Sequence, residues 1–270
     1  MNDTPTSGPI STSITQKERE VVSSRHSFRS NHLQALGSAE NSGARQEALG
    51  QFYVGIQPIV AETERAGLHS ATSVGFALEN LVKKLLQHPD WNTVSAINTT
   101  AAALGLFEEL ASNGTDNNIA NPALKILVVD DDPISRRALS NALQLMFGRP
   151  DLADCGKAAV KLASEKPYDV IFLDILMPDM SGFATCQKIR EAGTNKNCPI
   201  VFVTGESSLK AHDEALSAGG NGLIPKPVLP AEIALAATTF GLTARLRQQE
   251  ITGYPETSVR AGKMAELAKP

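Results

Sequence analysis

The stretch Asp169-Val-Ile-Phe-Leu-Asp174-Ile-Leu-Met-Pro-Asp179-Met-Ser-Gly182 decides how the second half of the chain folds. Its apolar run, Val170 to Leu173, is short and uninterrupted, which is typical of a strand buried on both faces of a parallel sheet. Asp174 follows directly, and ligands of open parallel sheets bind just beyond the carboxyl ends of the strands. The stretch therefore predicts a buried strand that carries one carboxylate into a binding region.

Five short apolar segments alternate with five amphipathic segments from Lys125 onward. The predicted strands are Lys125–Val129, Asp151–Ala153, Val170–Leu173, Ile200–Val203 and Gly222–Ile224. The predicted helices are Ile134–Phe147, Lys157–Ser164, Phe183–Glu191, Ser207–Ser217 and Ala231 to about Gln248. This alternation predicts an α/β fold in which a doubly wound parallel sheet is covered by helices on both faces.

The segment 44–113 has a different pattern, with apolar residues at helical spacing in three stretches. The first stretch ends near Ala66, the second stops at His88-Pro89, and Asp90 is placed to cap the third. Three helices of this kind form most of a bundle. We therefore predict an N-terminal α-helical, bundle-like region ahead of the α/β domain.

The remaining segments are polar. Residues 1–43 are rich in Ser, Thr and Asn, and we expect most of them to be mobile because they cannot bury enough apolar surface to offset their ordering entropy. Residues 114–122 are typical of a turn-rich linker. Residues 244–270 are predicted to form a C-terminal tail, too short for another folded domain.

Composition excludes several classes of function. The net charge of -4 and the pI of about 5.8 give no global basic field that would favour nucleic acid. The three cysteines, Cys155, Cys186 and Cys198, show no metal-binding spacing and indicate free thiols in a reducing cytosol. No signal peptide is recognisable, and no apolar run is long enough to span a bilayer. We expect a soluble, cytoplasmic protein without a membrane partner.

Polar side chains follow four of the predicted strands. Asp130 and Asp131 come after the first strand, Asp174 after the third, Thr204 after the fourth and Lys226 after the fifth. Three carboxylates at one edge of a sheet repel one another without a cation, and hard oxygen ligands with room for water suit Mg²⁺. A hydroxyl and an ammonium group beside them can neutralise and position a phosphoryl group attacked by Asp174.

These motifs resemble the receiver domain of two-component response regulators. The resemblance covers about Ala123 to Gly241, within a predicted domain of residues 123–243. It rests on Leu127-Val-Val-Asp-Asp131, Leu173-Asp174, Met177-Pro178, Gly182, Thr204-Gly205 and Lys226-Pro227. It implies a flavodoxin-like (βα)5 fold with strand order 2-1-3-4-5. It also implies that the chain accepts a phosphoryl group from a histidine kinase or a histidine phosphotransfer protein in a Mg²⁺-dependent phosphorelay.

The resemblance assigns a role to each polar residue. Asp174 is then the phosphoacceptor, Thr204 bonds a phosphoryl oxygen, and Lys226 pairs with the acyl phosphate and precedes a cis-proline. The implied Mg²⁺ ligands are Asp130, Asp131, Asp174 and the backbone carbonyl of Leu176. A receiver of this kind is a phosphoacceptor that signals through protein–protein contacts, not an enzyme with turnover. A homodimer through its fourth helix, fifth strand and fifth helix is one assembly that the resemblance allows.

The chain departs from the family at two places. Leu223 stands where the family has an aromatic switch residue, so we expect the response to run through residues 205–208 and the fourth helix, with Leu223 staying buried or nearly so. The helical region resembles a histidine phosphotransfer domain, but Gln57 occupies the position of the phosphorylatable histidine. A degenerate, binding-only bundle is the reading that this substitution favours.

Other function classes account for fewer of the residues. Asp130-x-Asp132 is also how phosphohydrolases of the haloacid dehalogenase type begin, but Asp132-Pro133 is explained as a helix start, and no pair of adjacent acids follows Lys226. A scaffold that is never phosphorylated would leave the intact acids, Thr204 and Lys226 unexplained. A DNA-binding output is unsupported, because the chain shows no basic recognition helix.

Overall fold

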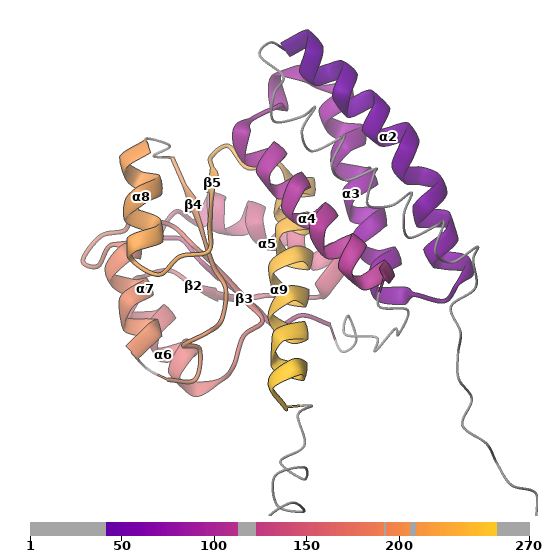
Figure 1. Ribbon diagram of the computed structural model, residues 1–270. Coiled ribbons are helices and arrows are strands. Elements are labelled where there is room, and N and C mark those ends of the chain that lie inside the picture. Colours follow the sequence, from indigo (N-terminus) through magenta and orange to yellow (C-terminus); the bar gives the residue numbers. More distant parts are fainter. Residues whose placement is uncertain (1–41, 113–122, 192, 206–208, 253–270) are drawn as a thin grey trace, which may run out of the picture.

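The computed structural model describes residues 42–112, 123–191, 193–205 and 209–252. Figure 1 shows two parts that pack side by side, a helical unit (residues 42–112) and an α/β unit (residues 123–252). The helical unit consists of α2 (Ser42–Arg65), α3 (His69–Gln87), a short 3-10 turn η1 (Pro89–Trp91) and α4 (Val94–Ser112). The predicted mobile segment up to residue 41 and the predicted linker 114–122 lie outside the described residues.

The five strands of the α/β unit form one parallel sheet in the order β2-β1-β3-β4-β5. The strands are β1 (Ile126–Val129), β2 (Asp151–Ala153), β3 (Val170–Leu173), β4 (Ile200–Thr204) and β5 (Gly222–Pro225). The predicted fold class and strand order are confirmed. The register pairs Val129 with Leu173 and Leu173 with Phe202, so β1 and β3 end level with each other, and β4 continues past them to Thr204.

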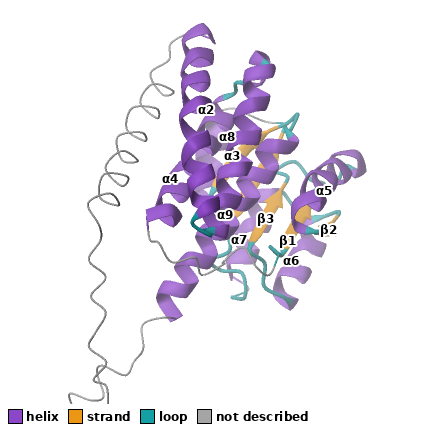
Figure 2. Ribbon diagram, turned by 90° about the vertical axis from the view of Figure 1, so that its right-hand side faces the viewer, coloured by secondary structure: helices purple, strands orange, loops and turns teal. Residues whose placement is uncertain are grey.

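Helices cover both faces of the sheet, as Figures 1 and 2 show. They are α5 (Pro133–Phe147), α6 (Gly156–Glu165), α7 (Gly182–Glu191), α8 (Leu209–Ser217) and α9 (Pro230–Thr252). Successive side chains of a strand point to opposite faces. Ile126 and Val128 therefore pack with α5 and α9, whereas Leu127 and Val129 pack with α6, α7 and α8. Burial on both faces is the physical reason for the uninterrupted apolar strands.

The start of α5 is as the sequence predicts, but the start of α4 is not. The carboxylate of Asp132 accepts hydrogen bonds from the backbone N–H groups of Ile134 and Ser135, both at 3.1 Å. The prediction that Asp90 caps α4 is wrong, because Asp90 lies within η1. The hydroxyl of Thr93 accepts from Ala96 N–H at 3.1 Å instead.

Helix α9 extends past residue 243, where a C-terminal tail was predicted to begin. It continues to Thr252. The guanidinium group of Arg245 donates to both carboxylate oxygens of Asp169, at 2.9 and 2.8 Å, and to the backbone carbonyl of Ala123 at 3.2 Å. This bidentate pair ties the last turns of α9 to the residue that precedes β3, and the helix ends a few residues beyond the predicted end near Gln248.

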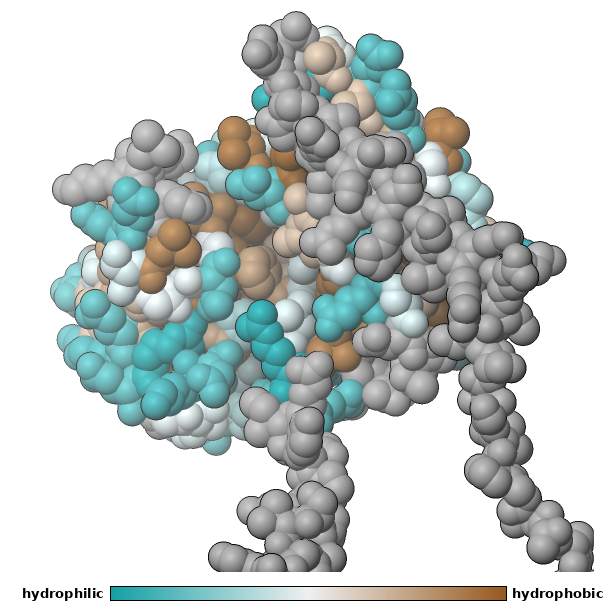
Figure 3. All heavy atoms as spheres, viewed as in Figure 1, coloured by the Kyte–Doolittle hydropathy of each residue, from teal (hydrophilic) through white to brown (hydrophobic). Residues whose placement is uncertain are grey.

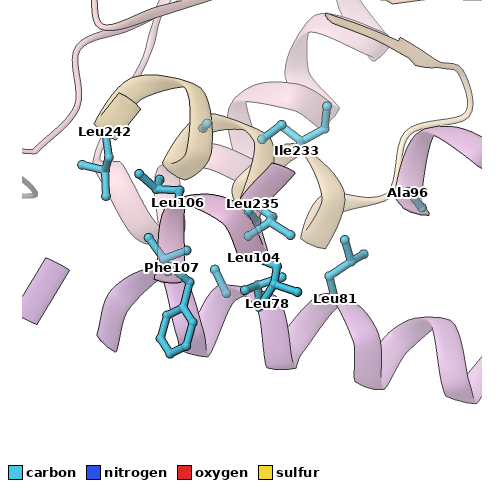
Figure 4. Packing of buried hydrophobic residues seen from close by; sticks show 14 of the residues in the cluster. Leu78, Leu81, Ala96, Leu104, Leu106, Phe107, Ile233, Leu235 and Leu242 are labelled. Carbon is cyan, nitrogen blue, oxygen red and sulfur yellow. The ribbon is translucent and has the colours of Figure 1, made fainter. Parts of the chain in front are cut away.

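One hydrophobic core joins the helical unit to the α/β unit. Figure 4 shows Leu78 and Leu81 of α3 and Leu104 of α4 close to Leu235 of α9. The same cluster of buried side chains continues through α9 to the sheet residues Val128 and Phe172. Helix α9 therefore packs against both the helical unit and the sheet. The two predicted regions share one core and do not pack as separate bodies.

A buried carboxylate lies where α4 meets α9. Glu232, in the first turn of α9, is 3% exposed and accepts a hydrogen bond from the hydroxyl of Ser95 at 2.5 Å. Burial raises the pKa of this carboxyl, and the hydrogen bond from Ser95 lowers it only in part. The folded protein thus binds the proton of Glu232 more tightly than the unfolded chain does.

The raised pKa of Glu232 determines the direction in which the stability of the protein changes with pH. The stability that Glu232 contributes is present while the residue is protonated, and it is lost as pH rises through the raised pKa of the folded state. Glu232→Gln imitates the protonated form and should increase the free energy of unfolding at pH 7 by on the order of 1 kcal/mol. Urea unfolding checks this, and the gain should shrink toward pH 4.

The matched control for this prediction is Glu47→Gln, since Glu47 is an exposed glutamate of α2. Exposed substitutions of this kind change stability by less than about 0.5 kcal/mol. A Glu232→Gln protein that is less stable than wild type at pH 7 would show that the carboxylate is a net stabiliser and contradict the prediction.

Candidate functional site

Three carboxylates meet at the carboxyl edge of the sheet. Asp130 follows β1 and Asp174 follows β3, and these two strands are neighbours in the sheet. Ligand oxygens of Asp130, Asp131 and Asp174 lie within 4.8 Å of one another. Asp130 is fully buried and Asp174 is 6% exposed, so water screens their mutual repulsion poorly. The structure brings together the three acids that the sequence predicts.

Lys226 bridges two of these acids. Its Nζ atom lies 2.8 Å from Oδ2 of Asp130 and 2.9 Å from Oδ2 of Asp174. Lys226 follows β5, its backbone N–H donates to the carbonyl of Thr204 at 2.7 Å, and the Lys226–Pro227 peptide bond is cis, as predicted. One ammonium group is therefore held at the centre of the acidic cluster.

The charges of the cluster do not balance. Burial raises the pKa of Asp174, Lys226 lowers it through a hydrogen bond and its charge, and Asp130 raises it again, leaving the pKa above its usual value. Burial lowers the pKa of Lys226, but hydrogen bonds to Asp130 and Asp174 outweigh this and raise it overall. Three carboxylates facing one ammonium group leave an excess of negative charge that a divalent cation would compensate.

Oxygen ligands of this kind fit Mg²⁺. The ion binds proteins through one or two carboxylates and keeps several waters. Asp131 is the most solvent-accessible of the three acids, which leaves room for those waters. The donor set therefore suits a hard cation, which Asp130 and Asp131 could bind next to Asp174.

Two residues that the sequence reasoning missed hold the acidic pair in place. The hydroxyl of Ser135 donates to Oδ2 of Asp130 at 2.5 Å, and Nη1 of Arg136 donates to the backbone carbonyls of Asp130 and Asp131 at 2.5 and 3.3 Å. Both residues lie in the first turn of α5. Their spacing from the acids, about one helical turn beyond a helix start, is the signal that could have identified them.

Thr204 and Leu176 lie at the rim of the cluster. Thr204 is the last residue of β4, is fully buried, and pairs in register with Pro225 of the edge strand β5. The backbone N–H of Leu176 donates to Oδ1 of Asp174 at 3.4 Å, and the Leu176 side chain is 60% exposed. The predicted roles of the Thr204 hydroxyl and the Leu176 carbonyl stay predictions.

The loop after Asp174 is closely packed around a glycine. Gly182 N–H donates to the carbonyl of Ile175 at 2.9 Å. A Cβ atom on Gly182 would overlap the backbone carbonyl oxygen of Asp174 and lie 2.9 Å from the Cα atom of Ile175. Asp179, at the tip of the loop, has a positive φ of 67°. The loop conformation that presents Asp174 thus depends on the absence of a side chain at residue 182.

In the helical unit, the position predicted for a phosphorylatable histidine is an exposed Gln57 on α2. His69 is the first residue of α3 and is also exposed. The likeness to histidine phosphotransfer domains stays a prediction.

Leu223 of β5 is half-buried, so the expectation that it is buried or nearly so holds only in part. No described helix combines the length and the apolar composition needed to cross a bilayer.

Comparison with known proteins identifies the α/β unit. The family model of the response regulator receiver domain matches residues 126–238. Signal transduction histidine-protein kinase BarA of Escherichia coli is 31% identical over 106 residues, which are 39% of this chain and 12% of that protein. Response regulator PleD of Caulobacter vibrioides is 31% identical over 149 residues, 53% of this chain and 32% of PleD.

Among solved structures, chemotaxis protein CheY4 of Vibrio cholerae shares 32% sequence identity and a TM-score of 0.40. The match covers 41% of this chain and 92% of CheY4. The chain spans less than two thirds of the length of BarA and of PleD. The helical unit lies outside the residues that the family model matches.

Proposed function

Because residues 126–238 form a response regulator receiver domain, we propose that the chain accepts a phosphoryl group on Asp174 in a Mg²⁺-dependent phosphorelay. The observation that carries this proposal is the bridge from Lys226 to Asp130 and Asp174, with Asp131 beside it. These are the groups that phosphoryl transfer needs: a nucleophile, a fixed cation and oxygen ligands for a second cation.

The proposed chemistry begins with attack on phosphorus. A carboxylate oxygen of Asp174 forms the new P–O bond, the bond from phosphorus to the donor's nitrogen or oxygen breaks, and the leaving group keeps that electron pair. The ammonium group of Lys226, now 2.9 Å from Asp174, pairs with an oxygen of the acyl phosphate. Thr204 donates its hydroxyl to another phosphoryl oxygen. Mg²⁺ held by Asp130 and Asp131 would neutralise charge on the phosphoryl oxygens.

The phosphodonor that this site suits is a histidine kinase or a histidine phosphotransfer protein. Two exposed apolar side chains support docking of a protein at the site: Ile134, which is 78% exposed in the first turn of α5, and Leu176, which is 60% exposed. Ile134 follows the acidic pair in the chain, and Leu176 follows Asp174. Exposed apolar groups beside a charged site are typical of protein contact surfaces.

We propose further that the chain is a phosphoacceptor without sustained turnover. A phosphohydrolase of the haloacid dehalogenase type would need further acids after Lys226 to hold its cation. Among the described residues beyond Lys226, the buried acid Glu232 is engaged with Ser95 on α4 instead. The helical unit is proposed to bind without accepting phosphate, since the amide of Gln57 is not a nucleophile.

Incubation of the purified chain with acetyl phosphate and Mg²⁺ tests the proposal. We expect label to accumulate toward one phosphoryl group per chain, and chelation of the cation to prevent it. Steady release of inorganic phosphate over many turnovers would favour the phosphohydrolase instead. A chain that takes no label with Mg²⁺ present would favour the scaffold and contradict the proposal.

A further inference from the structure

A cavity lies at the opposite edge of the sheet from Asp174. It has a volume of about 670 Å³ and lies where the amino ends of β4 and β5 meet the end of α7, the second half of α9 and one residue of α4. Asp174 follows the carboxyl end of β3, and all the strands are parallel, so the cavity is separate from the acidic cluster. Cavities of this size are typical of sites for small molecules.

The charged residues that line this cavity are all cations. They are Arg190 of α7, Lys196 in the loop before β4, and Arg247 of α9. No lining residue is a carboxylate, and none of the three cations forms an ion pair with a described residue. Figure 3 shows hydrophilic residues over α7 that continue towards the lower half of α9. Although the chain has a net charge of -4, this cavity concentrates positive charge and therefore favours anions.

Arg190 is held in place by neutral acceptors. Its guanidinium group donates to the backbone carbonyl oxygens of Asn195 at 3.1 Å, Cys198 at 2.6 Å and Gly219 at 2.7 and 3.2 Å, and to Oδ1 of Asn221 at 3.1 Å. These five bonds match the five N–H groups of an arginine side chain. Because no acceptor is charged, Arg190 is a fixed cation whose charge is not neutralised by its partners.

Asn221 supplies a hydrogen-bond donor with a fixed orientation. Its Oδ1 atom accepts from the backbone N–H of Ile200 at 2.9 Å as well as from Arg190. These two bonds determine which end of the amide is the oxygen. The Nδ2 group donates to no described residue, so its two N–H groups remain available to a ligand in the cavity.

The uncharged lining residues include an aromatic ring. Phe240 of α9 lines the cavity together with Pro199 and Ala244. The position of the ring depends on Gly222 at the start of β5, because a Cβ atom there would lie only 3.1 Å from Cζ of Phe240. Aromatic side chains stack on the flat bases of nucleotides, and this contact does not depend on which base is present.

We infer that this cavity is a binding site for a small phosphorylated molecule that carries a flat ring, of the nucleotide class. Lys196 and Arg247 contact its phosphate groups, and Arg190 adds a fixed positive charge. Guanidinium and ammonium groups are the usual partners of phosphate in proteins. The Nδ2 group of Asn221 donates to an oxygen of the ligand, and the ring of Phe240 packs against the base.

An inorganic phosphate ion fits the same cavity less well. It would pair with the cations but leave most of the volume of about 670 Å³ to water, with no partner for Phe240. Ala102 belongs to α4 and the other lining residues belong to the α/β unit, so a bound nucleotide contacts both units. The inference goes beyond the proposed function and requires neither Mg²⁺ nor a phosphoryl group on Asp174.

Isothermal titration calorimetry of the full chain tests the inference. The titrants are ATP, AMP, ribose 5-phosphate, inorganic phosphate and adenosine, with a chelator present so that no Mg²⁺ is bound at the acidic cluster. We expect AMP to bind at least about fivefold more tightly than ribose 5-phosphate, because only AMP has a base to stack. ATP should bind more tightly than AMP and lose affinity as salt screens its charge, and adenosine should bind most weakly.

A charge variant locates the phosphate groups. Replacing both exposed cations, as Lys196→Gln with Arg247→Gln, should weaken ATP binding by about tenfold, which corresponds to a modest contribution from each exposed charge. The matched control is Lys188→Gln with Arg137→Gln, which removes two exposed cations that do not line the cavity. This control should bind ATP like wild type. Equal affinity of the two double variants would contradict the assigned site.

A second variant blocks the cavity without changing its charge. Ala102 is exposed on α4, so Ala102→Trp places a large ring at the cavity with little effect on the core, and it should abolish ATP binding. Ala138→Trp is the matched control, because Ala138 is exposed on α5 and does not line the cavity. Retained binding in Ala102→Trp would show that ATP binds elsewhere and overturn the inference.

The outcomes separate this inference from the proposed function. Absence of binding by wild type at about 1 mM ATP or AMP would overturn the inference. Equal affinity for AMP and inorganic phosphate would also overturn it, because the cavity would then attract any anion. Labelling by acetyl phosphate with Mg²⁺ is measured on the same proteins, and we expect Lys196→Gln with Arg247→Gln to take label like wild type. Normal labelling without nucleotide binding would leave the proposed function standing and the inference wrong.

Discussion

Asp174→Asn is expected to abolish phosphorylation by acetyl phosphate while leaving the fold intact. The asparagine amide has the shape of the carboxylate but does not attack phosphorus, so label should fall by at least about a thousandfold, to background. Burial raises the pKa of Asp174, which shows that the buried charge has a cost in the folded state. Removing that charge should keep the free energy of unfolding equal or increase it.

The matched control is Asp179→Asn, five residues later in the same loop. Asp179 has a φ of 67°, a conformation that asparagine adopts nearly as readily as aspartate. This variant should take label like wild type. Phosphate-affinity electrophoresis of the three proteins makes the comparison. Full labelling of Asp174→Asn would place the phosphoacceptor elsewhere.

Gly182→Ala is expected to have the largest effect on stability of any single methyl group added near the site. The new Cβ atom would overlap the carbonyl oxygen of Asp174. That oxygen belongs to the backbone, so the overlap cannot be relieved by a change of side-chain rotamer. The loop from Asp174 to Gly182 must therefore shift. We expect a loss of about 2–4 kcal/mol in the free energy of unfolding and a parallel loss of phosphorylation.

Gly50→Ala separates this clash from the general effect of replacing glycine. Gly50 lies inside α2, and its nearest neighbour to an added Cβ is a side-chain atom of Leu86 at 4.0 Å. Alanine there should stabilise the protein by about 0.5–1 kcal/mol, because glycine is unfavourable within a helix. Urea unfolding of both variants gives the two values. A Gly182→Ala protein as stable as wild type would show that the loop relaxes without strain.

The fold could be predicted from the sequence because the strands can be recognised from their amino-acid composition. A strand buried on both faces reads as an apolar run, and the runs Val170–Leu173 and Ile200–Val203 coincide with observed strands to within a residue. The acids could be predicted for the same reason, since each follows such a run and parallel strands end at one edge. The cis Lys226–Pro227 bond came from the resemblance and not from the pattern.

What the sequence did not reveal depends on contacts between distant segments. Ser95 and Glu232 are 137 residues apart, and no local pattern connects a serine in one helix to a glutamate in another. One signal was present, because the residues from Ile233 to Ala244 carry no charge, which indicates a helix covered on more than one side. The cap at Asp90 failed for a local reason: Pro89 starts a 3-10 turn, which delays α4 until Val94.

The most direct test of the phosphoacceptor is to locate the modified residue chemically. The chain would be treated with acetyl phosphate and Mg²⁺ and then reduced with borohydride, which converts an aspartyl phosphate to homoserine. Peptide mass spectrometry then reads the position. The account predicts homoserine at residue 174 and unchanged aspartate at Asp130 and Asp131. Homoserine at another position, or a phosphoryl group retained on a histidine such as His69, would contradict it.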